Sequence, residues 1–148
     1  MVDIGGFTAD YVRLRNGVPD MAACDSLENG VILLYNRICA KANAELDILL
    51  EESEIDRILR GEDQDAAPEV IALAEREAQE FINDLLSGLR ERMLELKSGK
   101  VIFLGGGATL LHRQIEASGK IGQAIFVEDI NANAKGYEYL YRLQHSGR

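Results

Sequence analysis

The chain of 148 residues has an ordinary apolar share of 47% and a formal net charge of −9. A chain of this length is typical of one domain that buries a core without help from disulfides or metals. The acidic balance disfavours broad binding to nucleic acid or to an anionic membrane, and no apolar run has the length of a membrane-spanning helix. The opening residues do not read as a signal peptide, and Cys24 and Cys39 lack metal-binding or redox spacing. We therefore expect a cytoplasmic protein without direct contact to nucleic acid or membrane.

The first part of the chain is predicted to form a β-meander. A short apolar run, Val2 to Ile4, precedes residues 7–15, whose side chains alternate as those of a strand do. Asn16-Gly17 favours a type I′ hairpin turn, because both residues accept positive φ. Pro19 places the start of the return strand, residues 18–24, at a sheet edge or a bulge.

A glycine-rich turn joins the first two predicted strands. Asp3 ends the first strand, and Gly5, Gly6, Phe7 and Thr8 follow it. Glycine N–H groups can approach an anion closely, the Thr8 hydroxyl can donate, and an aspartate can hold Mg²⁺ through water. The turn is therefore a candidate phosphate-binding loop, and a plain hairpin with an incidental acid is the alternative. It differs from a Rossmann or Walker loop, which leads into a helix.

Helical periodicity dominates the middle of the chain. Asp25 and Ser26 predict the start of a helix that runs through Leu50, and a short helix is expected over residues 54–59. Residues 61–67 are acidic and indicate an exposed loop, after which Pro68 begins a long amphipathic helix to about Leu96. The charged face of that helix is solvated by default and is the face best placed to meet a partner subunit. The inward stripe of the first helix is predicted to comprise Leu27, Val31, Leu34, Ile38, Ala42 and Leu49.

A second glycine turn follows a continuous apolar strand, Lys100 to Leu104. Gly105, Gly106, Gly107 and Ala108 stand between this strand and a helix to about Ala117. Backbone at such a junction can touch a ligand, whereas close packing of strand on helix would need only one glycine. The final elements predicted are a strand over 124–127 and a helix from Ala134 to about Leu143. His112 and His145 lack neighbours at metal-ligand spacing and are expected to be structural or exposed.

The order of these motifs resembles the second half of the actin-like ATPases, the superfamily that includes actin, Hsp70 chaperones, sugar kinases and bacterial filament proteins. The stretch from Asp3 to Asp10 resembles its second phosphate motif, and the stretch from Val101 to Ala108 resembles its adenosine motif. The ParM/StbA plasmid-segregation group is the most similar, through Gly30-Val31 at a helix start and Gly136-Tyr137 near the end. Phe7 departs from the small or hydroxyl residue common at its position, which could remove one phosphate contact.

The resemblance implies an α/β, ribonuclease H-like fold with a mixed five-stranded sheet and helices on both faces. It further implies one second domain over 1–148, with a core of 1–50 and 97–148, a helical insertion of 51–96, and a missing amino-terminal domain. Asp3 would position Mg²⁺ at the β/γ-phosphates. The phosphates would bind Gly5, Gly6, Phe7 and Thr8, and the adenosine side would face Gly105, Gly106, Gly107 and Ala108.

The function that follows from the resemblance is the carboxy-terminal half of a ParM-like ATPase that binds ATP or GTP with Mg²⁺. Its filaments would move plasmid DNA through a DNA-binding adaptor protein. Because the groups that polarise water lie in the family's other domain, we expect this chain alone to bind nucleotide weakly and to hydrolyse it poorly. A non-polymerising Hsp70-like or reactivase-type ATPase is the main alternative. A sugar or acetate kinase, and a binding module that has lost nucleotide, are further ones.

Overall fold

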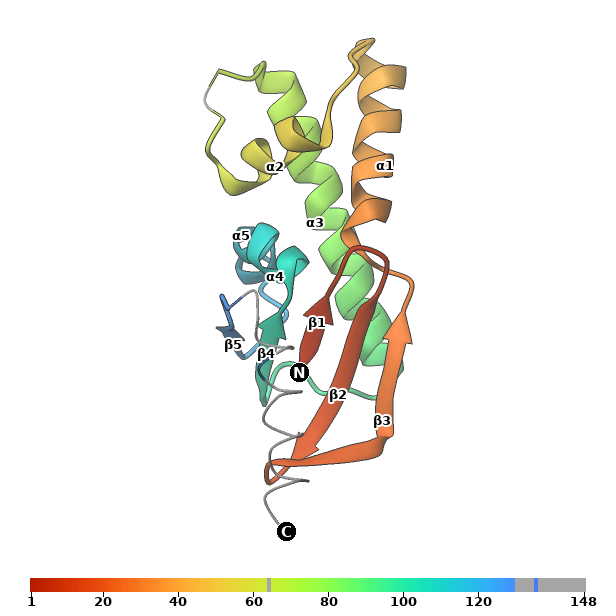
Figure 1. The fold of residues 1–148 in the computed structure, drawn as a ribbon, viewed down its shortest axis with the longest axis vertical. Coiled ribbons are helices and arrows are strands. Elements are labelled where there is room, and N and C mark those ends of the chain that lie inside the picture. Colours follow the sequence, from red (N-terminus) through yellow and green to blue (C-terminus); the bar gives the residue numbers. More distant parts are fainter. Residues whose placement is uncertain (64, 130–134, 136–148) are drawn as a thin grey trace.

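The computed structural model describes residues 1–63, 65–129 and 135 (Figure 1). In chain order its elements are β1 (Val2–Ile4), β2 (Ala9–Arg15), β3 (Val18–Leu27), α1 (Val31–Lys41), the π-helix η1 (Ala42–Leu46), α2 (Glu52–Arg60), α3 (Pro68–Glu91), β4 (Lys100–Leu104), α4 (Gly106–Leu110), α5 (His112–Ala117) and β5 (Gln123–Phe126). The sheet and the helices α1 and α3 extend along one long axis, with the β2–β3 hairpin at one end and the α1–α2 and α2–α3 connections at the other. The helix expected over 134–143 and His145 lie outside the described residues, Lys135 excepted.

The five strands form one sheet in the order β3-β2-β1-β4-β5. The pairs β1–β2 and β2–β3 are antiparallel, whereas β1–β4 and β4–β5 are parallel. The predicted mixed sheet of five strands is thereby confirmed. Asn16 and Gly17 have φ of 52° and 79°, as the predicted hairpin turn requires, and Pro19 lies on the edge strand β3.

Alternation along the strands separates a buried face from a more accessible one. Val2 and Ile4 are 3% and 0% exposed, while Asp3 between them belongs to the other face. Residues of α1 and α3 cover the buried face, and α3 crosses behind the sheet in Figure 1. The largest fully buried side chains of this core are Ile4, Leu34, Ile38, Ile55, Leu59, Phe81, Ile82, Leu85, Leu86, Leu89, Phe103 and Leu111.

Helix α1 begins four residues later than the capping pattern predicts. Ser26 and Leu27 remain in strand β3, where they pair with Asp10 and Ala9, and the Ser26 hydroxyl donates to the Asp10 carboxylate. The helix therefore starts at Val31 rather than at Leu27. Its regular turns end at Lys41, and η1 follows.

The predicted end of this first helix is also wrong. Asp47 has a left-handed φ of 56° and ends η1, so the chain turns away before Leu50. Leu49 is consequently 84% exposed instead of joining the inward stripe, whereas Leu34, Ile38 and Ala42 are fully buried as predicted.

Helices α2 and α3 also differ in their bounds from the prediction. Helix α2 starts at Glu52 because Glu51 and Glu54 form a reciprocal capping box. Helix α3 begins at Pro68 as predicted but ends at Glu91, five residues early. Met93 adopts φ of 59°, and the Leu94 N–H donates to the Leu89 carbonyl oxygen at 3.3 Å, which is the pattern of a helix-ending Schellman turn.

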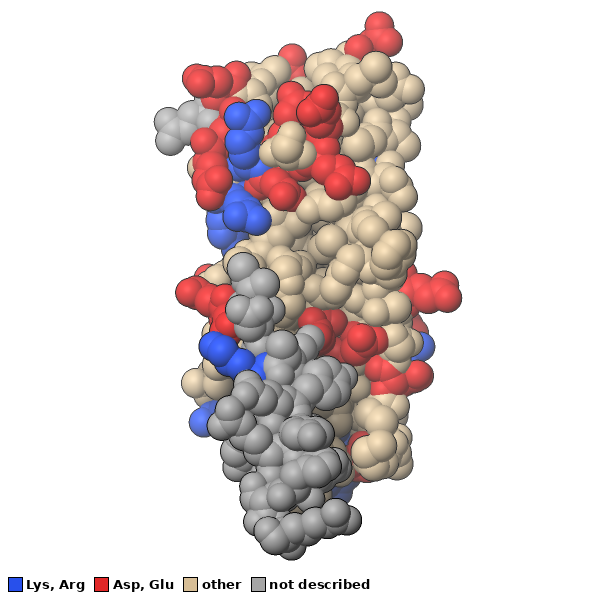
Figure 2. All heavy atoms as spheres, in the orientation of Figure 1, with Lys and Arg blue, Asp and Glu red and all other residues tan. Residues whose placement is uncertain are grey.

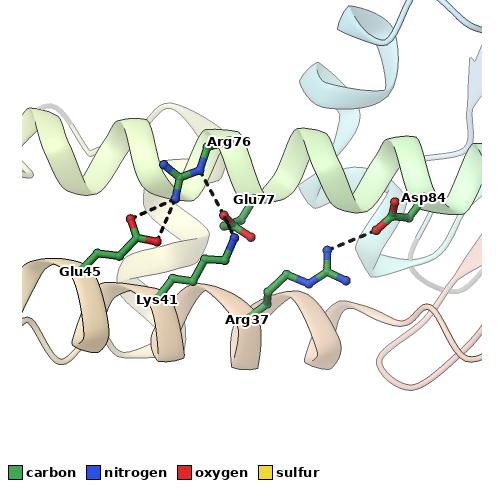
Figure 3. Close-up of polar contacts among 6 residues, drawn as sticks. All are labelled: Arg37, Lys41, Glu45, Arg76, Glu77 and Asp84. Carbon is green, nitrogen blue, oxygen red and sulfur yellow. Dashed lines mark hydrogen bonds and ion pairs between the residues drawn. The ribbon is translucent and has the colours of Figure 1, made fainter.

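Charged side chains connect the antiparallel helices α1 and α3 along their length (Figure 3). Lys41 Nζ donates to Glu77 Oε1 at 2.6 Å, and Arg76 Nε donates to the same oxygen at 3.2 Å. Arg76 also pairs with Glu45. Arg37, one helical turn before Lys41 on α1, pairs with Asp84 of α3. Glu77 is 0% exposed, and burial of a carboxylate is costly unless the charge is paired. Its two cationic partners offset this cost. None of the helices in the described part of the chain is long and apolar enough to span a bilayer.

Candidate functional site

The two glycine turns lie at the same edge of the sheet. Strands β1 and β4 are parallel neighbours, with Asp3 opposite Leu104, so both strands end at this edge. The turn formed by residues 5–8 follows β1, and the turn formed by residues 105–108 follows β4. In open α/β sheets the crevice beyond the carboxyl ends of parallel strands is the usual place for a ligand.

The first turn is held by hydrogen bonds to its own backbone and to the start of α1. The Gly5 N–H donates to the Thr8 carbonyl oxygen at 2.8 Å, which closes the turn. The Val31 N–H donates to the Gly5 carbonyl at 3.0 Å, and the Gly30 N–H donates to the Phe7 carbonyl at 3.1 Å. A Cβ on Gly30 would overlap the Gly6 carbonyl oxygen, so only glycine allows α1 to start this close to the turn.

The second turn packs directly against the first strand. Gly105 has φ of 90°, and a Cβ there would meet the Asp3 carboxylate and lie 2.7 Å from the Ile4 carbonyl oxygen. A Cβ on Gly107 would lie 2.5 Å from Ile4 Cγ2 and 2.7 Å from Val31 Cγ1. Gly105 and Gly107 are therefore required by packing, which is the structural alternative that the sequence left open. A Cβ on Gly106 meets no atom within 4 Å, so packing gives no reason for that glycine.

A cavity of about 260 Å³ lies between the turns. Its lining includes backbone from both of them, namely Gly5, Gly6, Gly106 and Gly107, together with Val31, Tyr35, Asp56, Arg60 and Leu110. Pockets that enclose a drug-sized ligand have volumes of roughly 300–1,000 Å³. The cavity is therefore smaller than a pocket that encloses a whole ligand of that size.

Part of the cavity lining is polar. The Tyr35 hydroxyl, on α1, donates to Asp56 Oδ1, on α2, at 2.5 Å. Burial and this carboxylate together raise the pKa of Tyr35, so the phenol stays protonated and keeps its role as donor. The cavity lining also contains Arg60, which lies one helical turn after Asp56 on α2.

Sequence reasoning missed these three residues. Tyr35 follows Gly30 by little more than one helical turn, which was an available signal that its side chain lies near the first glycine turn. Asp56 and Arg60 have the i,i+4 spacing of a shared helix face, but nothing local shows that this face looks toward a turn fifty residues earlier.

Five of the sequence-predicted site residues lie beside the cavity rather than in its lining. Phe7 is 79% exposed, the Thr8 hydroxyl is 3.4 Å from Asp10 Oδ2, and Ala108 is buried at 2% exposure. Gly105 packs on Asp3, as described above. Gly5 does line the cavity, but its N–H is already bonded to the Thr8 carbonyl and is not open to a phosphate.

Asp3 lies on the accessible face of the sheet, directly opposite Asp10 of β2. Both residues line a neighbouring depression of about 250 Å³. Within the described residues, no group of three or more His, Cys, Asp or Glu side chains has the arrangement of a metal site. Two carboxylates nevertheless suit Mg²⁺, which is usually held by one or two of them together with substrate phosphates and water.

The chain matches the family model described as archaeal actin homologue MreB-like, C-terminal, over residues 1–117. Its fold is similar to that of Ta0583, an archaeal actin homolog, with a TM-score of 0.71 and 20% identity over 96% of this chain and 47% of that one. It is similar to Bacillus thuringiensis ParM solved with ADP, with a TM-score of 0.64 and 13% identity over 97% of this chain and 46% of that one. A filament structure of Alp12 gives a TM-score of 0.66 and 18% identity over 93% of this chain and 46% of that one.

These likenesses show that the fold is that of the actin-like ATPases, as the sequence predicts. The chain spans just under half the length of each solved chain. No curated protein sequence matches it.

Proposed function

The chain belongs to the family of MreB-like archaeal actin homologues, as a C-terminal domain of that family, and from this premise we propose that it is the nucleotide-binding carboxy-terminal half of an actin-like ATPase. The observation that carries the proposal is the shared cavity: four glycines from two distant turns line it, together with Tyr35, Asp56 and Arg60. A site lined both by bare backbone and by hydroxyl, carboxylate and guanidinium groups suits a ligand that has an anionic part and a polar part.

In this proposal the phosphates lie against the first glycine turn, and the second glycine turn faces the adenosine side. Gly6, Phe7 and Thr8 have no backbone acceptor for their N–H groups within the described residues, so the first turn has donors to offer. Gly106 leaves open space that a phosphate or sugar atom can fill. The nucleoside extends toward Asp56, whose carboxylate can accept from ribose hydroxyls, and toward Arg60.

Mg²⁺ is proposed to be held at Asp3, with Asp10 as the second carboxylate, and it would neutralise charge on the phosphates. A crystal structure of Ta0583 contains ADP, and ParM of Bacillus thuringiensis was solved with ATP, which supports an adenine nucleotide over GTP here. Because the cavity is smaller than a pocket that encloses a whole ligand, the remaining contacts and the water-polarising groups come from another lobe, the amino-terminal half in this proposal. ATP hydrolysis then belongs to the complete protein.

The proposal includes self-assembly. Alp12 was solved as a filament, and we infer that the complete form of this protein also polymerises, with a separate adaptor protein linking the filament to plasmid DNA. A non-polymerising chaperone-type ATPase shares the fold and predicts nucleotide binding without assembly. Light scattering of the complete protein with Mg-ATP distinguishes the two functions.

Nucleotide binding is tested by titration calorimetry of the protein with Mg-ATP and Mg-GTP. Gly106→Val places methyl groups at the cavity wall where a Cβ clashes with nothing, so the fold should persist while affinity falls at least about tenfold. Ser87→Val, at an exposed position of α3, is the matched control and should bind as the wild type does. Equal affinity in the two variants, or no binding by the wild type, would contradict the proposed site.

A further inference from the structure

Helix α2 ends beside the cavity, and side chains of α5 complete its last turn. The Gly61 N–H donates to the Ile58 carbonyl oxygen at 2.9 Å, as at an ordinary helix end. The Leu59 carbonyl oxygen instead accepts from two side chains of α5, through Arg113 Nη1 and Gln114 Nε2, each at 3.4 Å. Helix α5 therefore supplies partners for a carbonyl group that the end of a helix leaves open.

The same two side chains of α5 also bind α3. Gln114 Nε2 donates to Glu75 Oε2 at 2.8 Å, and Arg113 Nη1 pairs with Glu75 Oε1 at 3.3 Å. The Leu59 carbonyl and the Glu75 carboxylate are both acceptors, so the two N–H groups of the Gln114 amide must face them. We call Glu75, Arg113 and Gln114 the α5 clamp, because together they join the end of α2 to α3 and α5.

The α5 clamp is connected to the second glycine turn through the backbone. The Leu111 N–H donates to the Gly107 carbonyl oxygen at 3.0 Å, and the Ile115 N–H donates to the Leu111 carbonyl oxygen at 2.9 Å. Leu111 is fully buried, so this connection is also packed in the core. Figure 1 shows α4 and α5 between α2 and β4. The clamp consequently joins two parts of the cavity wall, the second glycine turn and the end of α2.

Arg60 is the cavity residue that this arrangement places. It follows Leu59 directly, and it lines both the cavity and a neighbouring depression of about 290 Å³. Figure 2 shows basic side chains gathered over the region where α2 and α5 meet. Arg57 and Arg113 of these helices each pair with a carboxylate, whereas Arg60 forms no hydrogen bond or ion pair with another described residue. The backbone of α2 therefore sets where the Arg60 guanidinium can reach.

Stability does not explain why residue 114 is a glutamine. Gln114 is 2% exposed, and its Oε1 has no hydrogen-bond partner among the described residues. A buried acceptor without a partner costs stability, and an apolar side chain of the same shape avoids that cost. Ile55, Ile58 and Leu59 belong to the core and hold α2 in place without the clamp. A polar group that costs stability and contacts the end of α2 indicates a role in the neighbouring site.

We propose that Gln114, with Arg113 beside it, is a positioning residue for nucleotide binding, which fixes the end of α2 against the second glycine turn and so places Arg60 at the adenosine side of the cavity. This inference rests on the proposed function and names the residues that hold its site in shape. A ligand binds more tightly when the groups that contact it are already held in place. Loss of the clamp therefore lowers nucleotide affinity through Arg60 without unfolding the chain.

The test is calorimetry of the complete protein with Mg-ATP, combined with urea unfolding. Gln114→Met keeps the shape of the side chain and removes both N–H bonds, while Leu59 and Glu75 keep Arg113 as a partner. It should weaken binding at least about threefold and leave the unfolding midpoint at or above that of the wild type. Arg113→Met, at a side chain that is 56% exposed, should also weaken binding. A merely structural clamp predicts the reverse pattern, a lower midpoint with unchanged affinity.

Gln79→Met is the matched control. Gln79 Nε2 donates to the Gln114 carbonyl oxygen at 3.3 Å, so the same substitution here removes a bond between α3 and α5 and leaves the contacts to α2 in place. The Gln114 carbonyl keeps the Ser118 N–H as a donor at 3.1 Å. Gln79→Met should bind Mg-ATP as the wild type does, and a loss of affinity equal to that of Gln114→Met would overturn the inference.

A double-mutant cycle with Arg60→Met shows whether Gln114 acts through Arg60. Arg60→Met alone should weaken Mg-ATP binding, and the addition of Gln114→Met should then change the affinity less than about twofold. Equal losses from Gln114→Met in the two backgrounds would overturn the positioning role. Unchanged affinity in Arg60→Met would overturn it as well, because the clamp would then have no contact to place.

The inference and the proposed function fail in different ways. A wild type that binds Mg-ATP, with Gln114→Met and Arg113→Met variants of the same affinity as the wild type, would overturn the inference alone. A wild type that does not bind Mg-ATP would remove the proposed function together with the inference.

Discussion

Replacing Lys41 by Met tests how the helical part of the molecule is held together. In the wild type Glu77 is fully buried, its Oε1 accepts from Lys41 and Arg76, and its Oε2 has no partner among the described residues. Met has a similar length and keeps the apolar stem of the lysine, so the substitution removes the charge and the hydrogen bond with little change in packing. What remains is a buried carboxylate with Arg76 as its one cation.

The expected cost follows from the geometry. Breaking a buried ion pair costs roughly 3–5 kcal/mol, and a hydrogen bond to a charged group contributes roughly 1.5–3 kcal/mol. Lys41 is 39% exposed and Arg76 still donates, which places the expected loss near the lower range, at about 2 kcal/mol. Arg37→Met breaks the more exposed 3.3 Å pair with Asp84 on the same two helices and should cost less than about 1 kcal/mol.

The effect should depend on pH in a defined direction. Burial by itself raises the pKa of Glu77. The hydrogen bonds from Lys41 and Arg76 lower that pKa by more than burial raises it, so the net pKa lies below the usual value. A lowered folded-state pKa gives stability that is present above the unfolded pKa, about 4.3, and is lost as pH falls through the folded pKa. Lys41→Met removes one lowering contact, so the variant and the wild type should converge in stability as the pH falls through the folded-state pKa of Glu77.

The assay is urea unfolding of the chain at neutral and acidic pH, followed by circular dichroism, with Arg37→Met measured in parallel. The double variant Lys41→Met/Glu77→Met should recover most of the loss, because two packed apolar side chains replace the buried pair without leaving a charge. Equal losses for Lys41→Met and Arg37→Met at neutral pH would refute the reasoning, as would a double variant less stable than Lys41→Met alone.

Three further outcomes are expected. Gly107→Ala should destabilise the chain by about 1–3 kcal/mol in urea unfolding, because its Cβ overlaps Ile4, while Gly106→Ala should unfold as the wild type does; equal midpoints would contradict the packing argument. Tyr35→Phe removes the donor to Asp56 and should weaken Mg-ATP binding about threefold to tenfold in calorimetry. An unchanged affinity would show that the phenol has no part in the site. Asp56→Asn should weaken Mg-ATP more than Mg-2′-deoxy-ATP, and equal losses for the two nucleotides would exclude a contact to the 2′-hydroxyl.

The sequence by itself determined the number of strands and the turns of this protein, although not the end of β3. The hairpin at Asn16-Gly17, the strand Lys100–Leu104 and the start of α3 at Pro68 depend on local rules, namely the φ values a residue accepts, period-two alternation and the missing N–H of proline. The two glycine turns could also be predicted from the sequence, because glycine is favoured where the backbone must turn tightly or approach another group closely.

Tertiary contacts decided where α1 begins and which polar groups meet. The first N–H groups of α1 donate to carbonyl oxygens of a turn more than twenty residues earlier. The predicted capping residues, Asp25 and Ser26, therefore do not determine where the helix starts. Tyr35 and Asp56 lie on different helices, and only the packing of α1 and α2 brings the hydroxyl to the carboxylate. Glu77 lies on the charged face of α3, which the sequence predicts to be solvated, yet α1 covers this side chain. Local propensity has no information about a partner supplied from elsewhere in the chain, and that partner fixes the burial, the charge state and the site.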